Sequence, residues 1–562
     1  MPERKVFFGI LVFWLALCVW QAASTPLLTD EMYYATWARR PALYYFDHPP
    51  LIAWIVHVGQ ALFPGVWGLR LPALLFHVLT LQCVARLLLD RLSFFWFFAL
   101  GAATLLFHAH SLLAVPDSPY LLGCAAFLFF LKQFFETESQ SAALGMALSA
   151  AWTVTSKYHG WLFLALCLTP HLRFFWKRLR ALAPALLLWA GLVIPVYVPA
   201  ALGGFESLRL HLGGRHAAVQ VPEFPLEFVG GWLLVSGVWI YPWALWTGIR
   251  DQAAGLSPSL RRSLLWVAVG FPLLIGALSF NAAVEANWAA PALLAALLLL
   301  ASSPHFLRNS HKAIPTLIPL WGAVFLLRLG AGMAAEPLKR WRPLDFTSAD
   351  QWIPHIRHSA AGLPVVFLNS YHLAASYTWY TGQPAYSLNN FNYRRNQYDL
   401  WQWDTLYWNN PVFLVAQYPF QGFQRIETGL GPLYGLPLPN LRVFPQLEVA
   451  WQNHRRFYAA GALVPITLVL TNHYEKPVAP SHVDSGLHVL VTFWRLGHRI
   501  DSLEQYLPLP PNLFPLPPGA QAAWQPLLRM PRCSGPYGIR FSLRQGALEG
   551  GLSRNSYKVW IP

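Results

Sequence analysis

The sequence predicts a polytopic α-helical membrane protein with a C-terminal soluble region, first of α/β and then of β-rich character. Hydrophobic residues make up 55% of the 562 residues and charged residues only 12%. The mean hydropathy is +0.38. Soluble chains carry about 25% charged residues. This composition excludes a cytosolic enzyme, a disordered chain and a collagen-like fibre.

The net charge of +15 fits a membrane protein. In a soluble protein such a charge indicates nucleic acid. In a membrane protein it is typical of cytoplasmic loops and of contact with anionic headgroups. We therefore expect a membrane partner and no nucleic acid. Of the five cysteines only Cys533 lies in the polar tail, so the tail has no disulfide framework.

Apolar runs with few charges recur up to about residue 334 and predict about eleven transmembrane helices. They lie near 6–24, 69–89, 92–113, 118–132, 142–156, 159–172, 181–201, 229–249, 263–281, 286–303 and 313–334. The short runs at 142–172 also fit one long helix, or a helix and a re-entrant piece. The basic N-terminus before 6–24 also resembles a signal peptide, but this run is long enough to span a bilayer.

Lysine and arginine placement predicts the orientation. With the N-terminus in the cytoplasm, fourteen of these residues fall in cytoplasmic segments and six in short outer loops. This bias follows the positive-inside rule. An odd number of spans then places the C-terminal region outside.

The chain divides by composition into three parts. Residues 1–334 are the transmembrane domain, 335–440 an α/β region and 441–562 a β-rich module. Buried strands are expected at 364–369 and 411–416, with a helix at 371–380 that ends at Gly382. Strands of the last module are expected at 463–470, 487–493 and 537–543.

The first outer loop, about 25–68, carries Asp30, Glu31 and Asp47 on either side of an aromatic stretch. Carboxylates at a membrane face cost desolvation energy unless they are paired or hydrated. The pattern suits a helix in the membrane interface. An ordinary headgroup-facing loop is the alternative.

Other outer loops also carry polar groups, each with a simpler alternative. Asp117 and Asn287 precede apolar runs and would serve as helix N-caps. Lys157 would extend to the headgroups. Arg215, in a loop with two histidines and another arginine, suits a lipid phosphate or nonspecific headgroup contact.

All of these groups fall on one side of the predicted membrane. A transporter places its functional polar groups near the bilayer midplane. The distribution therefore favours chemistry at the interface on a lipid-borne substrate. A lipid-linked-sugar flippase or transporter remains the alternative, and a structural scaffold would leave the clustering unexplained.

Six segments together resemble the bacterial branch of the GT-C glycosyltransferases. The resemblance is to the dolichyl-phosphate-mannose-protein mannosyltransferase-like superfamily, which includes family 39 and the lipid A aminoarabinose transferases. It covers roughly residues 1–330. The matching segments are 29–34, 45–51, 68–72, 116–119, 156–160 and 285–288.

The resemblance implies a GT-C-like transferase in the bacterial inner membrane, with its C-terminal domain in the periplasm. The donor would be a sugar on polyprenyl phosphate, such as undecaprenyl phosphate, and the acceptor a lipid, glycan or protein. Asp30 matches the family's acidic position and would be the general base or would orient the acceptor, with Glu31 as the competing residue. Asp117 matches a second acidic position.

Asp47 and His48 fall where aminoarabinose transferases carry Glu-Lys near the donor phosphate. His48 lacks the fixed positive charge of lysine, so neutralisation of the phosphate would come from elsewhere. Candidates are Lys157, Arg70 and Arg215, with Tyr45 beside them, or a divalent cation held by Asp47, His48 and Asp117. Substrate positioning is assigned to Tyr158, His159, Glu285 and Asn287. The sequence leaves the sugar, the acceptor and the metal requirement open.

Overall fold

The computed structural model divides the chain into two compact units, Met1–Thr347 and Ser348–Pro562. Each unit is described by itself. The described residues are 4–88, 90–202, 224–251, 256–280, 283–332, 349–389, 395–429, 431–441, 443–479, 487–495, 502–545, 548–550 and 557–562.

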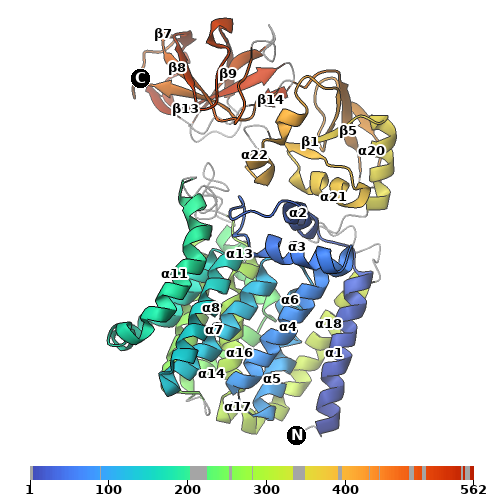
Figure 1. Cartoon of the computed structure of the whole chain (residues 1–562), viewed down its shortest axis with the longest axis vertical. Helices are drawn as coiled ribbons and strands as arrows, with labels where there is room; N and C mark the ends of the chain where they lie inside the picture. The colour runs from blue at the N-terminus through green and yellow to red at the C-terminus, as the bar shows by residue number, and fades with distance from the viewer. Residues whose placement is uncertain are drawn as a thin grey trace. The chain divides into compact units, whose positions relative to one another are not determined.

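The first unit is helical (Figure 1). Its main helices up to residue 202 are α1 (Arg4–Ser24), α2 (Thr29–Ala38), α3 (Leu51–Leu62), α4 (Val66–Leu88), α5 (Arg91–Gly101), α6 (Leu105–His110), α7 (Asp117–Thr137), α8 (Gln140–Ser156), α9 (His159–Leu168), α10 (Leu172–Trp176) and α11 (Leu179–Leu202). Those that follow are α13 (Phe224–Val235), α14 (Ile240–Arg250), α15 (Pro258–Leu278), η3 (Ala286–Ala289), α16 (Ala290–Ala301), α17 (Pro304–Asn309) and α18 (Ile314–Gly332).

Fewer helices are long enough to span a membrane than the sequence predicts. Six helical stretches in the described residues are long and apolar enough to cross a membrane, or up to seven if α13 and α14 form one bent span. The predicted count of eleven is not confirmed, because several apolar runs form short or divided helices. The run at 92–113, for example, becomes α5 and α6.

Short polar side chains fix several helix starts. Asp90, Ser139, Ser257 and Ser303 each accept a hydrogen bond from a backbone N–H in the first turn of the helix that follows. Such caps satisfy N–H groups that have no partner within the helix. Between them, the helices bury a large core of leucine, alanine and aromatic side chains, including nearly all of α16.

Two short helices, α2 and α3, occupy the connection that the sequence assigns to the first outer loop. Figure 1 shows them together across one end of the helical unit. Glycines bring α3 close to α4, since a Cβ on Gly59 would lie 2.1 Å from the carbonyl oxygen of Gly68. The close approach fixes α3, and so the loop before it.

The second unit begins with a mixed sheet in the order β2-β1-β3-β5-β4. Its strands are β1 (Val365–Leu368), β2 (Tyr386–Leu388), β3 (Val412–Ala416), β4 (Gln424–Ile426) and β5 (Leu433–Leu438). Strands β1, β2 and β3 pair in parallel, and the others are antiparallel. Helix α20 (Ile353–Ala360) precedes β1, and α21 (Tyr371–Thr381) links β1 to β2 and ends at Gly382, as predicted.

The rest of this unit is β-rich. One sheet has the order β10-β9-β13-β14, with β15 paired to β13, and a second has the order β11-β8-β6. A third pairs β12 with β7. The strands are β6 (Leu447–Gln452), β7 (Leu463–Pro465), β8 (Thr467–Asn472), β9 (Leu487–Arg495), β10 (Ser502–Pro508), β11 (Gln521–Trp524), β12 (Leu527–Arg529), β13 (Gly535–Gln545), β14 (Leu548–Gly550) and β15 (Tyr557–Ile561). One apolar core joins them.

Candidate active site

The first buried ion pair in the helical unit joins Glu31 on α2 to Arg70 on α4. The guanidinium binds the carboxylate in bidentate fashion, with Nε 2.9 Å from Oε1 and Nη2 2.7 Å from Oε2. Neither side chain is exposed. The carboxylate also accepts backbone N–H bonds from Leu28 and Ala114. Glu31 thus holds α2 against the chain segment that leads to α7.

Arg70 has no donor left for a phosphate. Its remaining N–H groups reach the carbonyl oxygens of Ala22, Thr25 and Pro26, at the end of α1 and just beyond. A guanidinium offers five N–H donors, and all five are used within the protein. This corrects the expectation that Arg70 contacts the donor phosphate. The same saturation makes Glu31 a poor proton acceptor and leaves Asp30 as the stronger candidate.

Asp30 lies in the first turn of α2 and is half-buried. An acidic side chain there is favoured by the helix dipole, which is positive at the N-terminus. The helical geometry turns Asp30 to a different face from its neighbour Glu31, which points to Arg70. Asp30 is therefore partly accessible while Glu31 is enclosed.

The loop after α2 is held by hydrogen bonds from tyrosines. Tyr33 donates from its hydroxyl to Asp47, at 2.8 Å. The hydroxyl of Tyr45 donates to the carbonyl of Arg40 and accepts from the backbone N–H of Ala42. Burial raises the pKa of Tyr45 to about 12. Tyr45 therefore supports the loop as a neutral hydroxyl, and the expectation that it contacts the donor phosphate gains no support from this geometry.

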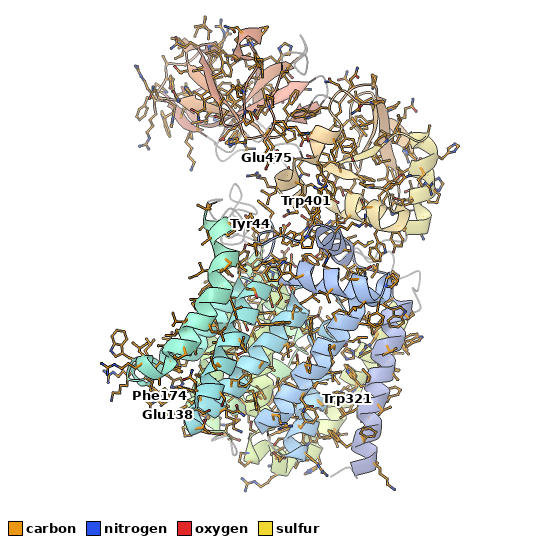
Figure 2. All side chains as sticks on the ribbon, in the orientation of Figure 1. Tyr44, Glu138, Phe174, Trp321, Trp401 and Glu475 are labelled. Carbon is orange, nitrogen blue, oxygen red and sulfur yellow. The ribbon has the colours of Figure 1, made fainter. Side chains whose placement is uncertain are left out.

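His48 follows Asp47 and is half-buried, with its ring 6.0 Å from that of Tyr34 on α2. The adjoining loop includes Tyr44, which Figure 2 shows at the α2 end of the helical unit. The loop thus keeps Asp47 and His48 beside α2. The sequence analysis also places these two residues at one site. The geometry by itself gives neither of them a role toward substrate.

The second buried ion pair joins Lys157 to Asp117, and a hydrogen bond adds Asn287 from a third segment. The Lys157 ammonium, between α8 and α9, donates to Asp117 Oδ1 at 2.7 Å. The side-chain amide of Asn287, in η3, donates to Asp117 Oδ2 at 3.3 Å. Asp117 and Lys157 are only 4% and 2% exposed. Neither Asp117 nor Asn287 acts as a helix N-cap, because α7 follows Pro116 and η3 follows Glu285 without a side-chain cap.

The remaining residues of the predicted site have different environments. Tyr158, directly after Lys157, is buried and packs against Tyr197 of α11. The ring of His159 lies 4.7 Å from that of Trp288, the residue after Asn287. Glu285 is exposed. Arg215 lies outside the described residues.

The described residues do not form the expected metal site. Among them, no three His, Cys, Asp or Glu side chains gather in a group that could hold a metal ion. Asp117 is instead neutralised by Lys157, and Asp47 accepts from Tyr33. The donor set therefore does not fit a cation shared by Asp47, His48 and Asp117, and no step below uses one.

Sequence reasoning missed a third polar cluster in the same unit. Arg328 of α18 is buried beside Gln21 and Cys18 of α1 and His108 of α6. His110 is buried two residues further on. An arginine within a predicted apolar span is a functional signal by itself.

Solved structures share this fold. The crystal structure of ArnT from Cupriavidus metallidurans bound to undecaprenyl phosphate aligns with a TM-score of 0.53 and 16% identity, over 77% of this chain and 98% of that chain. The apo state of the same protein gives a TM-score of 0.52, also at 16% identity and with the same coverage. No curated protein sequence matches the chain.

The chain shares the fold of ArnT, which agrees with the GT-C-like fold that the sequence resemblance predicts. Residues 47–201 match the family of dolichyl-phosphate-mannose-protein mannosyltransferases. That match spans Asp47, Asp117 and Lys157 and ends near the end of α11.

Proposed function

We propose that the chain is an integral membrane glycosyltransferase that moves a sugar from a polyprenyl-phosphate carrier to an acceptor in the bacterial cell envelope. The fold supports the reaction class, and ArnT of the same fold was crystallised with undecaprenyl phosphate. The observation that carries the proposal is the enclosed Lys157, which donates to Asp117, a carboxylate that also accepts from Asn287, at the end of the helical unit.

Lys157 provides the positive charge for the donor phosphate. Its ammonium has three N–H donors, of which Asp117 accepts one in the described part of the chain. Asp117 and Asn287 fix its direction. The phosphate becomes a better leaving group when its developing charge is stabilised in a site of low polarity. Arg70 cannot take this role because its donors are occupied.

Asp30 receives the proton from the acceptor. In the proposed step the acceptor oxygen forms a bond to the anomeric carbon while the bond from that carbon to the phosphate oxygen breaks. The acceptor proton passes to the Asp30 carboxylate, which acts as general base. Direct displacement inverts the anomeric centre. The site lies on the periplasmic face in this proposal, with the N-terminus in the cytoplasm.

The test is a deletion strain complemented with wild type or with Asp30→Asn. Envelope glycolipids, glycans and glycoproteins are compared by mass spectrometry. We expect one glycan mass to disappear on deletion and to return with wild type but not with Asp30→Asn. The missing mass identifies the sugar, and its carrier identifies the acceptor.

Asp90→Asn is the matched control, because Asp90 caps α5 and asparagine caps equally well. This variant should restore the glycan fully. An unchanged envelope after deletion would remove support for the transferase and direct attention to transport of lipid-linked sugars. Full restoration by Asp30→Asn would exclude Asp30 as the base.

A further inference from the structure

A pocket of about 290 Å³ lies between α14, α17 and the start of α18. Figure 1 shows α17 at the end of the helical unit where the chain begins, away from α2 and α3. In the proposed orientation this end faces the cytoplasm, so the pocket is separate from the candidate active site. Its lining includes Trp239, Trp243, Phe306, His305, Asn309 and Lys312.

One wall of the pocket is aromatic and is fixed by packing. The ring of Trp243 lies 5.5 Å from that of Trp239 and 5.2 Å from that of Phe306. Phe306 is buried, and its ring also contacts Trp96 of α5 at 5.4 Å. Tryptophan rings are enriched at the boundary between membrane and water. Residues of α5, α14 and α17 therefore form this wall without help from a ligand.

The other wall is cationic. His305 of α17 and Lys312, just before α18, are both exposed and line the pocket. Within the described part of the chain, neither side chain forms an ion pair with a carboxylate, and no protein group accepts a hydrogen bond from the Lys312 ammonium. The segment 304–312 also contains Arg308 and a second histidine, and it has no acidic residue. This wall is complementary to an anion.

The pocket adjoins a surface that faces lipid. Trp246 follows Trp243 by three residues, so the two side chains are neighbours on one face of α14. Trp246 is 59% exposed, and the Arg250 guanidinium lies 4.6 Å from the centroid of its ring. In a membrane such an exposed aromatic and basic surface contacts the headgroup region. This continuity favours a lipid ligand over a soluble phosphate compound.

We infer that this pocket binds the headgroup of an anionic phospholipid of the cytoplasmic leaflet. Lys312 donates to the phosphate oxygens, and charge-assisted hydrogen bonds of this kind are the stronger ones. The tryptophans contact the glycerol and the first methylene groups of the chains. Basic pockets between membrane helices on the cytoplasmic side are typical sites for anionic headgroups. The inference goes beyond the proposed transferase and takes only the orientation from it.

The test is binding to the full-length protein in detergent, measured by native mass spectrometry. The probes are dioleoyl phosphatidylglycerol, dioleoyl phosphatidylcholine with the same chains and no net charge, and glycerol 3-phosphate with no chains. Lys312→Gln removes the charge in the pocket. Arg308→Gln is the matched control, because Arg308 lies one turn earlier, is exposed and does not line the pocket.

We expect Lys312→Gln to weaken phosphatidylglycerol binding about tenfold and to leave phosphatidylcholine binding unchanged. Arg308→Gln should change neither, and Lys312→Arg should keep the affinity of wild type. Thr316→Trp fills the pocket, which Thr316 lines, and should also weaken phosphatidylglycerol. Ile318→Trp is its control, since Ile318 is 58% exposed and lies outside the pocket.

Three results would overturn the inference. Equal losses in Lys312→Gln and Arg308→Gln would show diffuse attraction to a basic surface rather than a site. Unchanged phosphatidylglycerol binding in both Lys312→Gln and Thr316→Trp would leave the pocket without this ligand. Displacement of phosphatidylglycerol by an equal concentration of glycerol 3-phosphate would make the ligand a soluble phosphate compound. Binding is measured without turnover, so each result is separate from failure of the Asp30→Asn complementation test.

Discussion

At the scale of residues, the helical unit uses its two ion pairs near α2 differently. Glu31 and Arg70 are fully enclosed, and each is saturated by protein partners. In the described part of the chain, Asp117 is the one acceptor that Lys157 contacts. Charge alone does not distinguish the two pairs in the sequence. The number of occupied donors does, and it separates the saturated arginine from the lysine that we propose as the phosphate ligand.

Loss of Arg70 should affect folding rather than chemistry. Arg70→Met leaves the Glu31 carboxylate buried without its counterion, and removal of one partner of a buried pair costs about 3–5 kcal/mol. Thermal unfolding in detergent should show a clearly lowered transition. The double variant Glu31→Leu/Arg70→Met should recover part of the loss. A single variant as stable as wild type would contradict this assignment.

Loss of Lys157 should affect chemistry. Lys157→Met removes the charge proposed to stabilise the leaving phosphate, and we expect kcat/KM to fall by about 100-fold or more. The assay follows release of polyprenyl phosphate by the purified protein. Asn287→Ala, which removes only the 3.3 Å bond to Asp117, should cost less. An equal or larger loss in Asn287→Ala would assign the main role to Asn287.

At the scale of elements, close backbone contacts position the loop beside α2. A Cβ on Gly68 would lie 2.0 Å from the carbonyl oxygen of Phe63, and one on Gly59 would meet Gly68. The end of α3 and the start of α4 therefore meet with no room for side chains. This contact sets where α3 begins, directly after Asp47, His48 and two prolines.

Gly59→Val should therefore displace α3. The added side chain clashes with backbone that cannot move independently, so we expect lower stability and reduced binding of undecaprenyl phosphate in the apolar groove between α3, α4 and α8, which Gly59 lines. Gly191→Val is the control, because a Cβ there meets no atom within 4 Å. Binding by native mass spectrometry checks the prediction. Equal binding by the two variants would show that the α3–α4 contact does not shape this groove.

The spacing of apolar residues predicts those helices and strands whose bounds are set by the local sequence. The helix at 371–380 and its end at Gly382 follow from spacing and from a glycine with positive φ. The apolar run at 229–249 reads as one helix, but the structure bends it by 84° between α13 and α14. Gly237 and Val238 both adopt positive φ there. Glycine permits this bend, but nothing local requires it, so the sequence alone could not reveal it.

The sequence indicates the individual residues of the candidate site, but it does not indicate which of them contact one another. Asp117, Lys157 and Asn287 each stood out as polar groups beside apolar runs. Their contacts span 40 and 170 residues of sequence. Arg70 looked equally suited to phosphate, because its partners at the end of α1 are backbone carbonyls, which leave no mark in the sequence.

At the scale of the whole molecule, the second unit contains a buried acid that makes stability depend on pH. Asp404 accepts hydrogen bonds from Tyr474 and Trp408. Burial nevertheless raises the pKa of Asp404 from 3.8 to about 7. The folded chain thus holds this proton more tightly than the unfolded chain does. The contribution of Asp404 to stability is greatest below about pH 4, falls as pH rises to about 7, and is constant above.

A shift of roughly three pKa units corresponds to at most about 4 kcal/mol. Thermal unfolding of the full chain between pH 4 and 8 should therefore show a transition that weakens with rising pH. Asp404→Asn should flatten this dependence. Glu427→Gln, at an exposed position of the same unit, should not. A steep pH dependence that persists in Asp404→Asn would assign the effect to another group.

The contact between Arg70 and α1 has a consequence for biogenesis. A helix leaves its last carbonyl groups without partners of its own. Here the carbonyl of Ala22 in the last turn of α1, and those of Thr25 and Pro26 just beyond it, accept hydrogen bonds from a guanidinium that is synthesised 48, 45 and 44 residues later. These carbonyl groups therefore lack the hydrogen bonds from Arg70 until α4 packs beside α1. We therefore expect α1 and α4 to reach their final positions together.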